Sequence, residues 1–197
     1  MTTGARAMPA PSRAFIAGPT AGAVIALVVL VLLNALFTPN FATAANTWNI
    51  LWQVSSVVLV AVGMTLVIAT AGIDLSVGSV MAIAGAVVAT QIGLGAPVAM
   101  LLALVGGAAV GFVSGSLIAR GRIQPIVVTL ATLIAGRGLA QVLSNDGQLV
   151  PVRDAALEVL GRGRLGPVPV PVIIAALVVA TAVFALRATP FGRYVLA

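Results

Sequence analysis

The sequence predicts an all-α protein, a polytopic transmembrane helix bundle with about six spans. Of the 197 residues, 61% are hydrophobic and 7% are charged, whereas soluble domains have about 45–50% apolar and 25% charged residues. The apolar residues form runs of about 20, the length that a helix needs to cross a hydrocarbon core of about 30 Å. The ten arginines stand mostly at the ends of these runs, which is typical of membrane interfaces.

Turn-forming segments such as "TPNFATAANTWN", "GLGAP" and "RGR" separate the predicted helices. The six predicted spans are, in chain order, Thr20–Phe37, Ile50–Ala71, Leu75–Ile92, Val98–Ala119, Ile123–Leu143 and Val170–Leu186. Arginines precede the first span, but a cleavable leader ending near the Ala-x-Ala pattern at Ala42 would exceed forty residues, against the usual 15–30 or so. We therefore expect an uncleaved first helix, preceded by a cytoplasmic segment at residues 1–19.

Arginine distribution predicts a cytoplasmic N-terminus. This orientation places six arginines inside, namely Arg6, Arg13, Arg120, Arg122, Arg187 and Arg193, and three outside, namely Arg153, Arg162 and Arg164. The excess inside agrees with the positive-inside rule. The three outer arginines share the segment Ser144–Pro169 with three acids, so we expect this longest extramembrane piece to be an external contact surface.

Composition also excludes much chemistry. The chain has no cysteine and no histidine, which removes thiol catalysis, imidazole bases and the usual zinc and haem ligands. It has no phosphate-binding loop, no H-E-x-x-H and no G-x-S-x-G motif. We predict no catalytic residues, no metal, no cofactor and no nucleic-acid partner, so energy for any transport would come from a partner subunit or a gradient.

The turn before the third span carries an acid, Asp74, in the stretch "IATAGIDLSVGSVMAIAGA". Because an exposed carboxylate at bilayer depth costs about 2.5–3.5 kcal/mol, such a residue normally faces protein or water. Three interpretations remain open: a solvated interfacial turn, a helix cap made by Asp74 or Ser76, or a broken-helix segment lining a translocation path. Capping and solvation are compatible.

Two further features lie in the fourth and fifth spans. Gly107, Gly111 and Gly115 form two consecutive G-x-x-x-G units, which we interpret as a face for helix packing. In the fifth span, Gln124–Pro125 begins a helix, and Arg137 follows about 20 Å further along it. Arg137 could extend to the external interface or face a pore.

Gly63–Ala89, "GMTLVIATAGIDLSVGSVMAIAGAVVA", resembles the signature of permease subunits of sugar ABC importers of the ribose, xylose and galactofuranose type. "RIQPIVVTLATLIAGRGLAQVLSNDGQLV" and "TPFGRYVLA" resemble two further family segments, in family order, from about Trp48 onward. The galactofuranose-type permeases look most similar. Ala71 replaces the first glycine of the family's G-G-I-D; since alanine fits most helical turns, we expect this departure to matter little.

The resemblance implies about ten spans in full-length members, so residues 20–197 would be a C-terminally truncated permease domain. It also implies a bacterial plasma-membrane location, a second permease subunit, a cytoplasmic ABC ATPase and an extracytoplasmic sugar-binding protein. The residues carried over to the path or inner gate are Gly72, Ile73, Asp74, Leu75, Ser76 and Gly78, with Gln124, Pro125, Thr129 and Arg137 as weaker candidates.

Three functions remain open at this point. The first is a permease for a monosaccharide, and the second is a permease for another small solute, such as a branched-chain amino acid or an autoinducer. The third is a membrane-embedded structural subunit that carries nothing. The solute captured by the partner binding protein separates the first two, and unchanged uptake after deletion would indicate the third.

Overall fold

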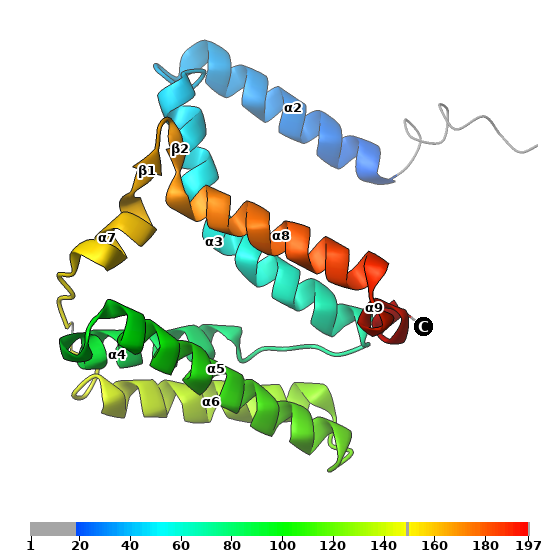
Figure 1. Cartoon of the computed structure of the whole chain (residues 1–197). Helices are drawn as coiled ribbons and strands as arrows, with labels where there is room; N and C mark the ends of the chain where they lie inside the picture. Colours follow the sequence, from blue (N-terminus) through cyan, green and yellow to red (C-terminus); the bar gives the residue numbers. More distant parts are fainter. Residues whose placement is uncertain (1–18, 149, 197) are drawn as a thin grey trace, which may run out of the picture. The chain divides into compact units, whose positions relative to one another are not determined.

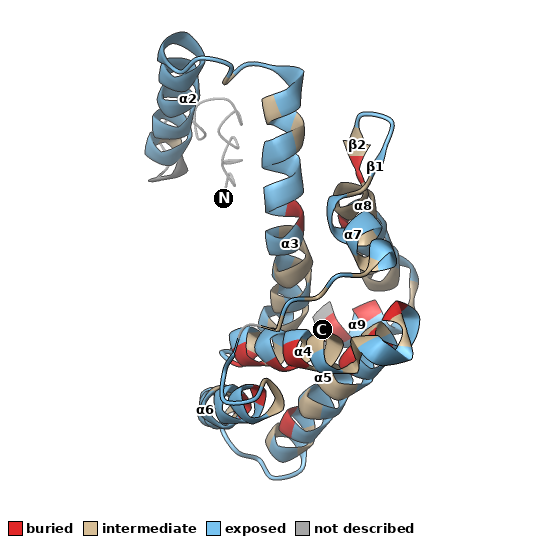
Figure 2. Ribbon diagram, turned by 90° about the vertical axis from the view of Figure 1, so that its left-hand side faces the viewer, coloured by how far each residue is buried: buried red, intermediate tan, exposed pale blue. Residues whose placement is uncertain are grey.

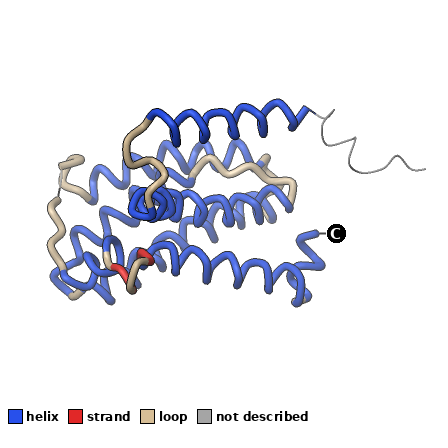
Figure 3. Tube along the Cα trace, turned by 90° about the horizontal axis from the view of Figure 1, so that it is seen from above, coloured by secondary structure: helices blue, strands red, loops and turns tan. Residues whose placement is uncertain are grey.

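The computed structural model describes residues 19–148 and 150–196, and helices dominate this part of the chain (Figure 3). Its strands are a two-stranded antiparallel hairpin, in which Leu165 pairs with Val168. The chain divides into two compact units, residues 1–50 and 51–197, and each is described by itself.

In the first unit, helix α2 (Pro19–Phe37) is followed by a short turn and by the start of α3 (Ala44–Ala69). The sequence predicted a turn as far as Asn49, which is wrong, because α3 begins six residues earlier than expected. Thr43 explains this start: its Oγ1 accepts a hydrogen bond from the Asn46 N–H at 3.3 Å, and the Asn46 side chain donates to the Phe41 carbonyl at 2.9 Å. A threonine that accepts from the third helical N–H is a typical N-cap.

The second unit contains a cluster of three helices, α4 (Val77–Gln91), α5 (Ala96–Ala119) and α6 (Pro125–Leu143), with a 3₁₀ turn, η1 (Ile92–Leu94), between α4 and α5. α4 packs extensively against both α5 and α6 (Figure 1). Buried residues appear as red segments on these helices in Figure 2. The cluster therefore contains much of the core of this unit.

The tightest contact in this cluster joins α4 to α6 at Ser79 and Gly136. Ser79 is fully buried, and a methyl group added to Gly136 would lie 2.8 Å from Ser79 Oγ and 2.9 Å from Ser79 Cβ. Only a residue without a side chain allows the two helices to approach this closely. In lipid, where apolar burial does not drive helix association, small residues of this kind permit packing.

The remaining elements are α7 (Ala155–Arg162), β1 (Arg164–Leu165), β2 (Val168–Pro169), α8 (Val170–Ala188) and α9 (Pro190–Leu196). The sequence analysis described Ser144–Pro169 only as an extramembrane piece and missed α7 and the hairpin within it. The sequence did indicate the start of α7, because Asp154 is a residue type that often caps helices. In the structure, Asp154 Oδ1 accepts hydrogen bonds from the Ala156 and Leu157 N–H groups at 2.9 and 3.2 Å. Trp52 Nε1 donates to the Gly161 carbonyl at 2.7 Å, which links α3 to the end of α7.

Within the described part of the chain, five helices meet the length and hydropathy expected of a membrane span: α3, α4 with η1, α5, α6 and α8. α2 (Pro19–Phe37) is also apolar and has 19 residues, as many as α6 and α8. The helical, polytopic fold class is thus confirmed. The third predicted span begins too early, since α4 starts at Val77 rather than Leu75.

We predict that Gly136→Val destabilises the protein by about 1–3 kcal/mol, the usual cost of overpacking. Gly138 is a matched control on the same helix, because a Cβ there meets no atom within 4 Å. Thermal unfolding of the purified, detergent-solubilised protein, followed by tryptophan fluorescence, measures both variants. Equal unfolding temperatures for Gly136→Val and Gly138→Val would contradict this packing.

Candidate functional site

The loop between α3 and α4 begins with a helix-ending hydrogen-bond pattern. The Gly72 N–H donates to the Val67 carbonyl at 3.0 Å, and the Ala71 N–H donates to the Ile68 carbonyl at 2.9 Å. These are the two bonds of a Schellman motif, in which the residue after the cap takes a left-handed conformation. That residue is Ala71, with φ of 56°.

The replacement of the family's glycine by Ala71 therefore affects the loop more than the sequence suggested. The expectation that it fits a helical turn is wrong, because α3 ends at Ala69 and Ala71 lies in the φ range that favours glycine. A left-handed conformation costs a residue with a side chain about 1–2 kcal/mol. Gly72 is also constrained, since a Cβ there would lie 3.2 Å from both the side chain and the carbonyl of Val67.

Asp74 organises the next part of the loop. Its Oδ1 accepts two hydrogen bonds from Ser76, one from the backbone N–H at 2.7 Å and one from the hydroxyl at 2.6 Å. Ser76 occupies the N-cap position of α4, but its side chain makes no cap bond. The carboxylate therefore satisfies an N–H close to the start of α4, as the cap interpretation proposed, although from two residues before the cap.

A network of hydroxyl groups connects this loop to α5 and α6. Thr129 Oγ1, on α6, donates to the Ile73 carbonyl at 3.2 Å. Ser79 Oγ donates to the Ser76 carbonyl at 2.8 Å and approaches the Thr132 carbonyl at 3.3 Å. The hydroxyls of Thr132 and Ser114 lie 3.0 Å apart. Among the described residues, no buried side-chain nitrogen or oxygen lacks a partner, so the network is fully satisfied.

Beside this network lies a cavity of about 370 Å³, here called the Asp74 cavity. Its lining comes from the end of α3, the loop, the second half of α5 and the start of α6. The lining residues are Val67, Thr70, Gly72, Ile73, Asp74, Ser76, Gly111, Ser114, Gly115, Ile118, Pro125 and Thr129. Its volume falls in the range of about 300–1,000 Å³ that is typical of small-molecule sites.

The Asp74 cavity brings together most of the residues singled out in the loop. Gly72, Ile73, Asp74 and Ser76 line it, together with the weaker candidates Pro125 and Thr129. Leu75 is exposed, and Gly78 lies in the first turn of α4; neither lines this cavity.

The other two weaker candidates lie elsewhere. Gln124 lines a smaller neighbouring cavity of about 200 Å³ with Ala71, Ile73 and Pro125. Arg137 lies further along α6, beside a separate cavity of about 550 Å³. Most of the candidate path residues therefore lie at or near the α3–α4 loop, whereas Arg137 lies beside a different cavity.

The glycine row of α5 has two environments. A Cβ at Gly107 would touch the Val80 side chain of α4 at 3.5 Å, whereas Cβ atoms at Gly111 and Gly115 would meet nothing within 4 Å. Gly111 and Gly115 instead line the Asp74 cavity. The packing role predicted for them stays a prediction, while Gly136, which the sequence analysis missed, makes the close contact between α4 and α6.

Ser114 is the functional candidate that the sequence reasoning overlooked. It is buried, lines the Asp74 cavity and contacts Thr132. A signal was present, since Ser114 and Ser116 are the two polar residues of α5, whose other residues are apolar or glycine. Within residues 19–148 and 150–196, no group of three or more acidic, histidine or cysteine side chains could hold a metal ion.

A family model described as "Branched-chain amino acid transport system / permease component" matches residues 46–197. The chain belongs to this permease family. Among curated proteins, the ribose import permease protein RbsC of Escherichia coli K12 is 43% identical over 181 residues, which cover 88% of this chain and 56% of the relative. The galactofuranose transporter permease protein YtfT of the same strain is 41% identical over 181 residues, covering 87% and 53%.

A more distant relative is the ribose import permease of Bacillus subtilis, 36% identical over 175 residues, covering 87% of this chain and 54% of the relative. The chain therefore spans about half the length of the curated relatives that it matches. The predicted resemblance to sugar permeases is confirmed. The narrower expectation that galactofuranose permeases are the most similar is wrong, because the ribose permease of Escherichia coli is more similar. No solved structure matches the chain.

We predict that Ala71→Gly stabilises the protein by about 1 kcal/mol, because glycine adopts a left-handed conformation at little cost. Ala69→Gly is the matched control: it lies two residues away, inside α3, where glycine costs up to about 1 kcal/mol. The two substitutions should shift the unfolding temperature in opposite directions. Destabilisation by Ala71→Gly would show that the loop does not have this conformation.

Proposed function

We propose that the chain forms part of the translocation path of an ATP-driven importer for a monosaccharide, and that the Asp74 cavity lies at its inner gate. The observation that carries the proposal is the cavity itself. In a chain of the permease family, an acidic residue at the end of a membrane helix lines a hollow of suitable size. The names of the relatives, which include ribose, galactofuranose and fructose permeases, support a sugar as the solute.

The chemistry of the Asp74 cavity suits a neutral, hydroxyl-rich solute. Both bonds from Ser76 use Oδ1 of Asp74, so among the described contacts Oδ2 keeps its capacity to accept from a hydroxyl group. The remaining lining is made of small or apolar side chains and hydroxyls, without a basic residue. Such a surface offers few strong contacts, as expected where a solute must leave as readily as it enters.

In this proposal the chain acts with partners in the bacterial plasma membrane. A cytoplasmic ABC ATPase supplies the energy, since this chain carries no phosphate-binding loop. An extracytoplasmic binding protein delivers the sugar, and a second permease subunit completes the path.

In the proposed orientation the N-terminus is cytoplasmic, which places the Asp74 loop and the turn at Arg120–Gln124 on the same, inner side. The neighbouring cavity lined by Ala71, Ile73 and Gln124 supports a location of the two turns on the same side, because it brings them together.

A branched-chain amino acid is the second candidate solute, because the description of the matching family model names that class. An amino acid carries a carboxylate and an ammonium group. A site for it would need a cation for the carboxylate, and none lines the Asp74 cavity. The sugar assignment stands first because the relatives are named as sugar permeases, and uptake of labelled ribose and leucine by the assembled importer distinguishes the two.

Asp74→Ala should reduce uptake by the assembled importer by roughly tenfold or more. The variant loses a charge-assisted pair of hydrogen bonds, of which one alone is worth about 1.5–3 kcal/mol, and each 1.4 kcal/mol or so corresponds to a factor of ten. Asp74→Arg should be at least as severe. The matched control is Glu158→Ala, on the exposed face of α7. Normal uptake kinetics in both Asp74 variants, at normal membrane levels, would exclude the gate assignment.

The orientation has an independent test, because the chain contains no native cysteine. Leu75→Cys and Val159→Cys place thiols at exposed positions, on the Asp74 loop and on α7 respectively. A membrane-impermeant maleimide should label Val159→Cys in intact cells, and Leu75→Cys only after the membrane is permeabilised. The reverse pattern would invert the orientation.

A further inference from the structure

A stripe of polar side chains follows one face of α6 and the turn after it. Arg137, Gln141, Ser144 and Gln148 are spaced by four, three and four residues. On a helix this spacing places side chains on the same face. α6 ends at Leu143, so Arg137 and Gln141 lie within the apolar helix, while Ser144 and Gln148 belong to the segment after it.

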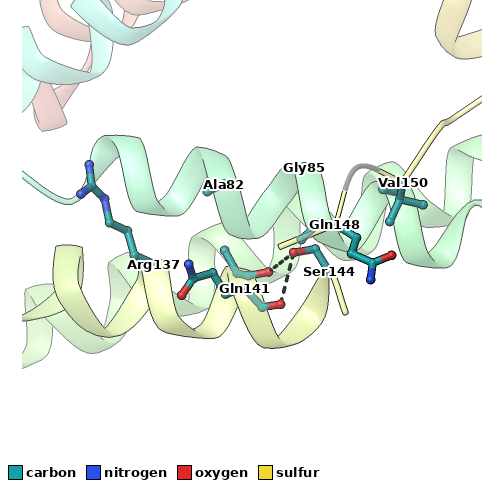
Figure 4. A pocket seen from close by; sticks show the side chains of 10 residues that line it. Ala82, Gly85, Arg137, Gln141, Ser144, Gln148 and Val150 are labelled. Atoms are coloured by element: carbon teal, nitrogen blue, oxygen red, sulfur yellow. Dashed lines mark hydrogen bonds between the residues drawn. The ribbon is translucent and has the colours of Figure 1, made fainter. Parts of the chain in front are cut away.

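These side chains line a cavity of about 550 Å³, here called the Arg137 cavity. Figure 4 shows Arg137, Gln141, Ser144 and Gln148 along one side, with Ala82 and Gly85 of α4 facing this stretch of α6. The α4 wall consists entirely of small residues, namely Ala82, Gly85, Ala86 and Ala89. A wall without large side chains leaves room for a small ring-shaped solute.

Much of the hydrogen-bonding capacity of the stripe is unused. The Ser144 hydroxyl is occupied, since it donates to the Ala140 carbonyl at 2.8 Å. In the part of the chain that the structure describes, the side chains of Arg137, Gln141 and Gln148 make no hydrogen bond. Together they offer guanidinium donors and two amide groups, each of which donates and accepts.

An arginine on this face constrains what lies opposite it. Arg137 lies about 18 Å along α6 from Pro125, toward the outer end of the helix, where a guanidinium group can extend to the aqueous interface or face a water-filled space. Arg137 is exposed in the described chain, and no acidic residue lines its cavity. The outer end of this cavity, at Arg137, therefore lies within reach of water.

The Arg137 cavity and the Asp74 cavity share no lining residue. On α6, the Asp74 cavity uses Pro125 and Thr129, near the first turn, and the Arg137 cavity uses residues from Arg137 onward. Gly136, which contacts Ser79 closely, lies between these two groups along α6. The two cavities are thus separate, and they differ in chemistry, because one presents a carboxylate and the other a cation and amides.

We propose that the Arg137 cavity is a second solute-binding site, at the outer end of the path, which holds a neutral polyhydroxylated solute through Arg137, Gln141 and Gln148. This inference rests on the proposed transport function. A neutral sugar fits better than an anion, because sugar hydroxyls both donate and accept and so use both ends of the two amides. An anion accepts only, so it would use the guanidinium and the amide NH2 groups and leave the amide oxygens of Gln141 and Gln148 without a donor.

Protection from thiol labelling tests this site in the complete importer, purified in detergent. Ala89→Cys introduces a single thiol into the wall of the cavity, and Val159→Cys provides the control thiol on α7, outside it. Ribose, with gluconate as the anionic probe, is added at increasing concentration while the labelling rate is measured. We expect ribose to slow the labelling of Ala89→Cys in a saturable manner, to leave Val159→Cys unchanged, and to act more strongly than gluconate.

A second substitution, combined with Ala89→Cys, tests whether the protection depends on the polar side chains of the stripe. Gln141→Leu or Arg137→Gln, combined with Ala89→Cys, should raise the ribose concentration needed for half-protection by about tenfold, the equivalent of 1.4 kcal/mol. Gln53→Leu, at an exposed position of α3 outside this cavity, should leave that concentration unchanged. Because Gln148 lies beyond α6, Gln148→Leu tests the same site without altering a membrane helix.

The outcomes separate the site from the transport function. Ribose uptake by the importer without protection of Ala89→Cys would overturn the Arg137 site and leave the proposed function standing. Stronger protection by gluconate than by ribose would overturn the neutral-solute assignment. If the unmodified importer transports no sugar, the proposed function fails, and the site, which rests on it, fails with it.

Discussion

The contact between Ser79 and α6 holds the candidate site in its shape. Ser79 is fully buried, and its single hydroxyl hydrogen is directed to the Ser76 carbonyl at 2.8 Å and, more weakly, to the Thr132 carbonyl of α6 at 3.3 Å. Ser76 in turn donates both its N–H and its hydroxyl to Asp74. A chain of hydrogen bonds therefore runs from α6 through the first turn of α4 to the carboxylate. Gly136 makes this possible, because any side chain there would push Ser79 away.

The environment of the protein explains why hydroxyl groups carry this network. Apolar surfaces gain little by association in lipid, so close packing and hydrogen bonds between helices carry more of the specificity. A serine or threonine hydroxyl can satisfy a backbone carbonyl without the desolvation cost of a charge. The network of Ser79, Ser114, Thr129 and Thr132 is placed around one acid, Asp74, which lies at the end of a helix rather than within it. A movement of α6 would thus reach the Asp74 loop directly, through Thr129 and the Ile73 carbonyl.

The sequence predicted the elements of the fold well and their ends less well. Runs of apolar residues identify membrane helices because the bilayer sets their length. The start of α3 and the existence of α7 depend instead on single capping side chains, Thr43 and Asp154, which have weak signals beside long apolar runs. The role of Ala71 could not be predicted either, because a left-handed φ follows from how α3 ends and not from the residue type. Cavities depend on which helices meet, so the separation of Arg137 from Asp74 became visible only in three dimensions.

The positions of the charged residues in the helical cluster suit transient passage rather than tight binding. Asp74 lies just before α4, and Arg137 lies in the second half of α6, so opposite charges line different cavities instead of neutralising each other. A direct ion pair within the membrane would occupy both groups and leave neither for a solute. Kept apart, the carboxylate presents acceptors at one place, and the guanidinium with two amides presents donors and acceptors at another. In the proposed importer, a hydroxyl-rich solute would exchange some of its water for a few hydrogen bonds at each place, which would favour entry without preventing release.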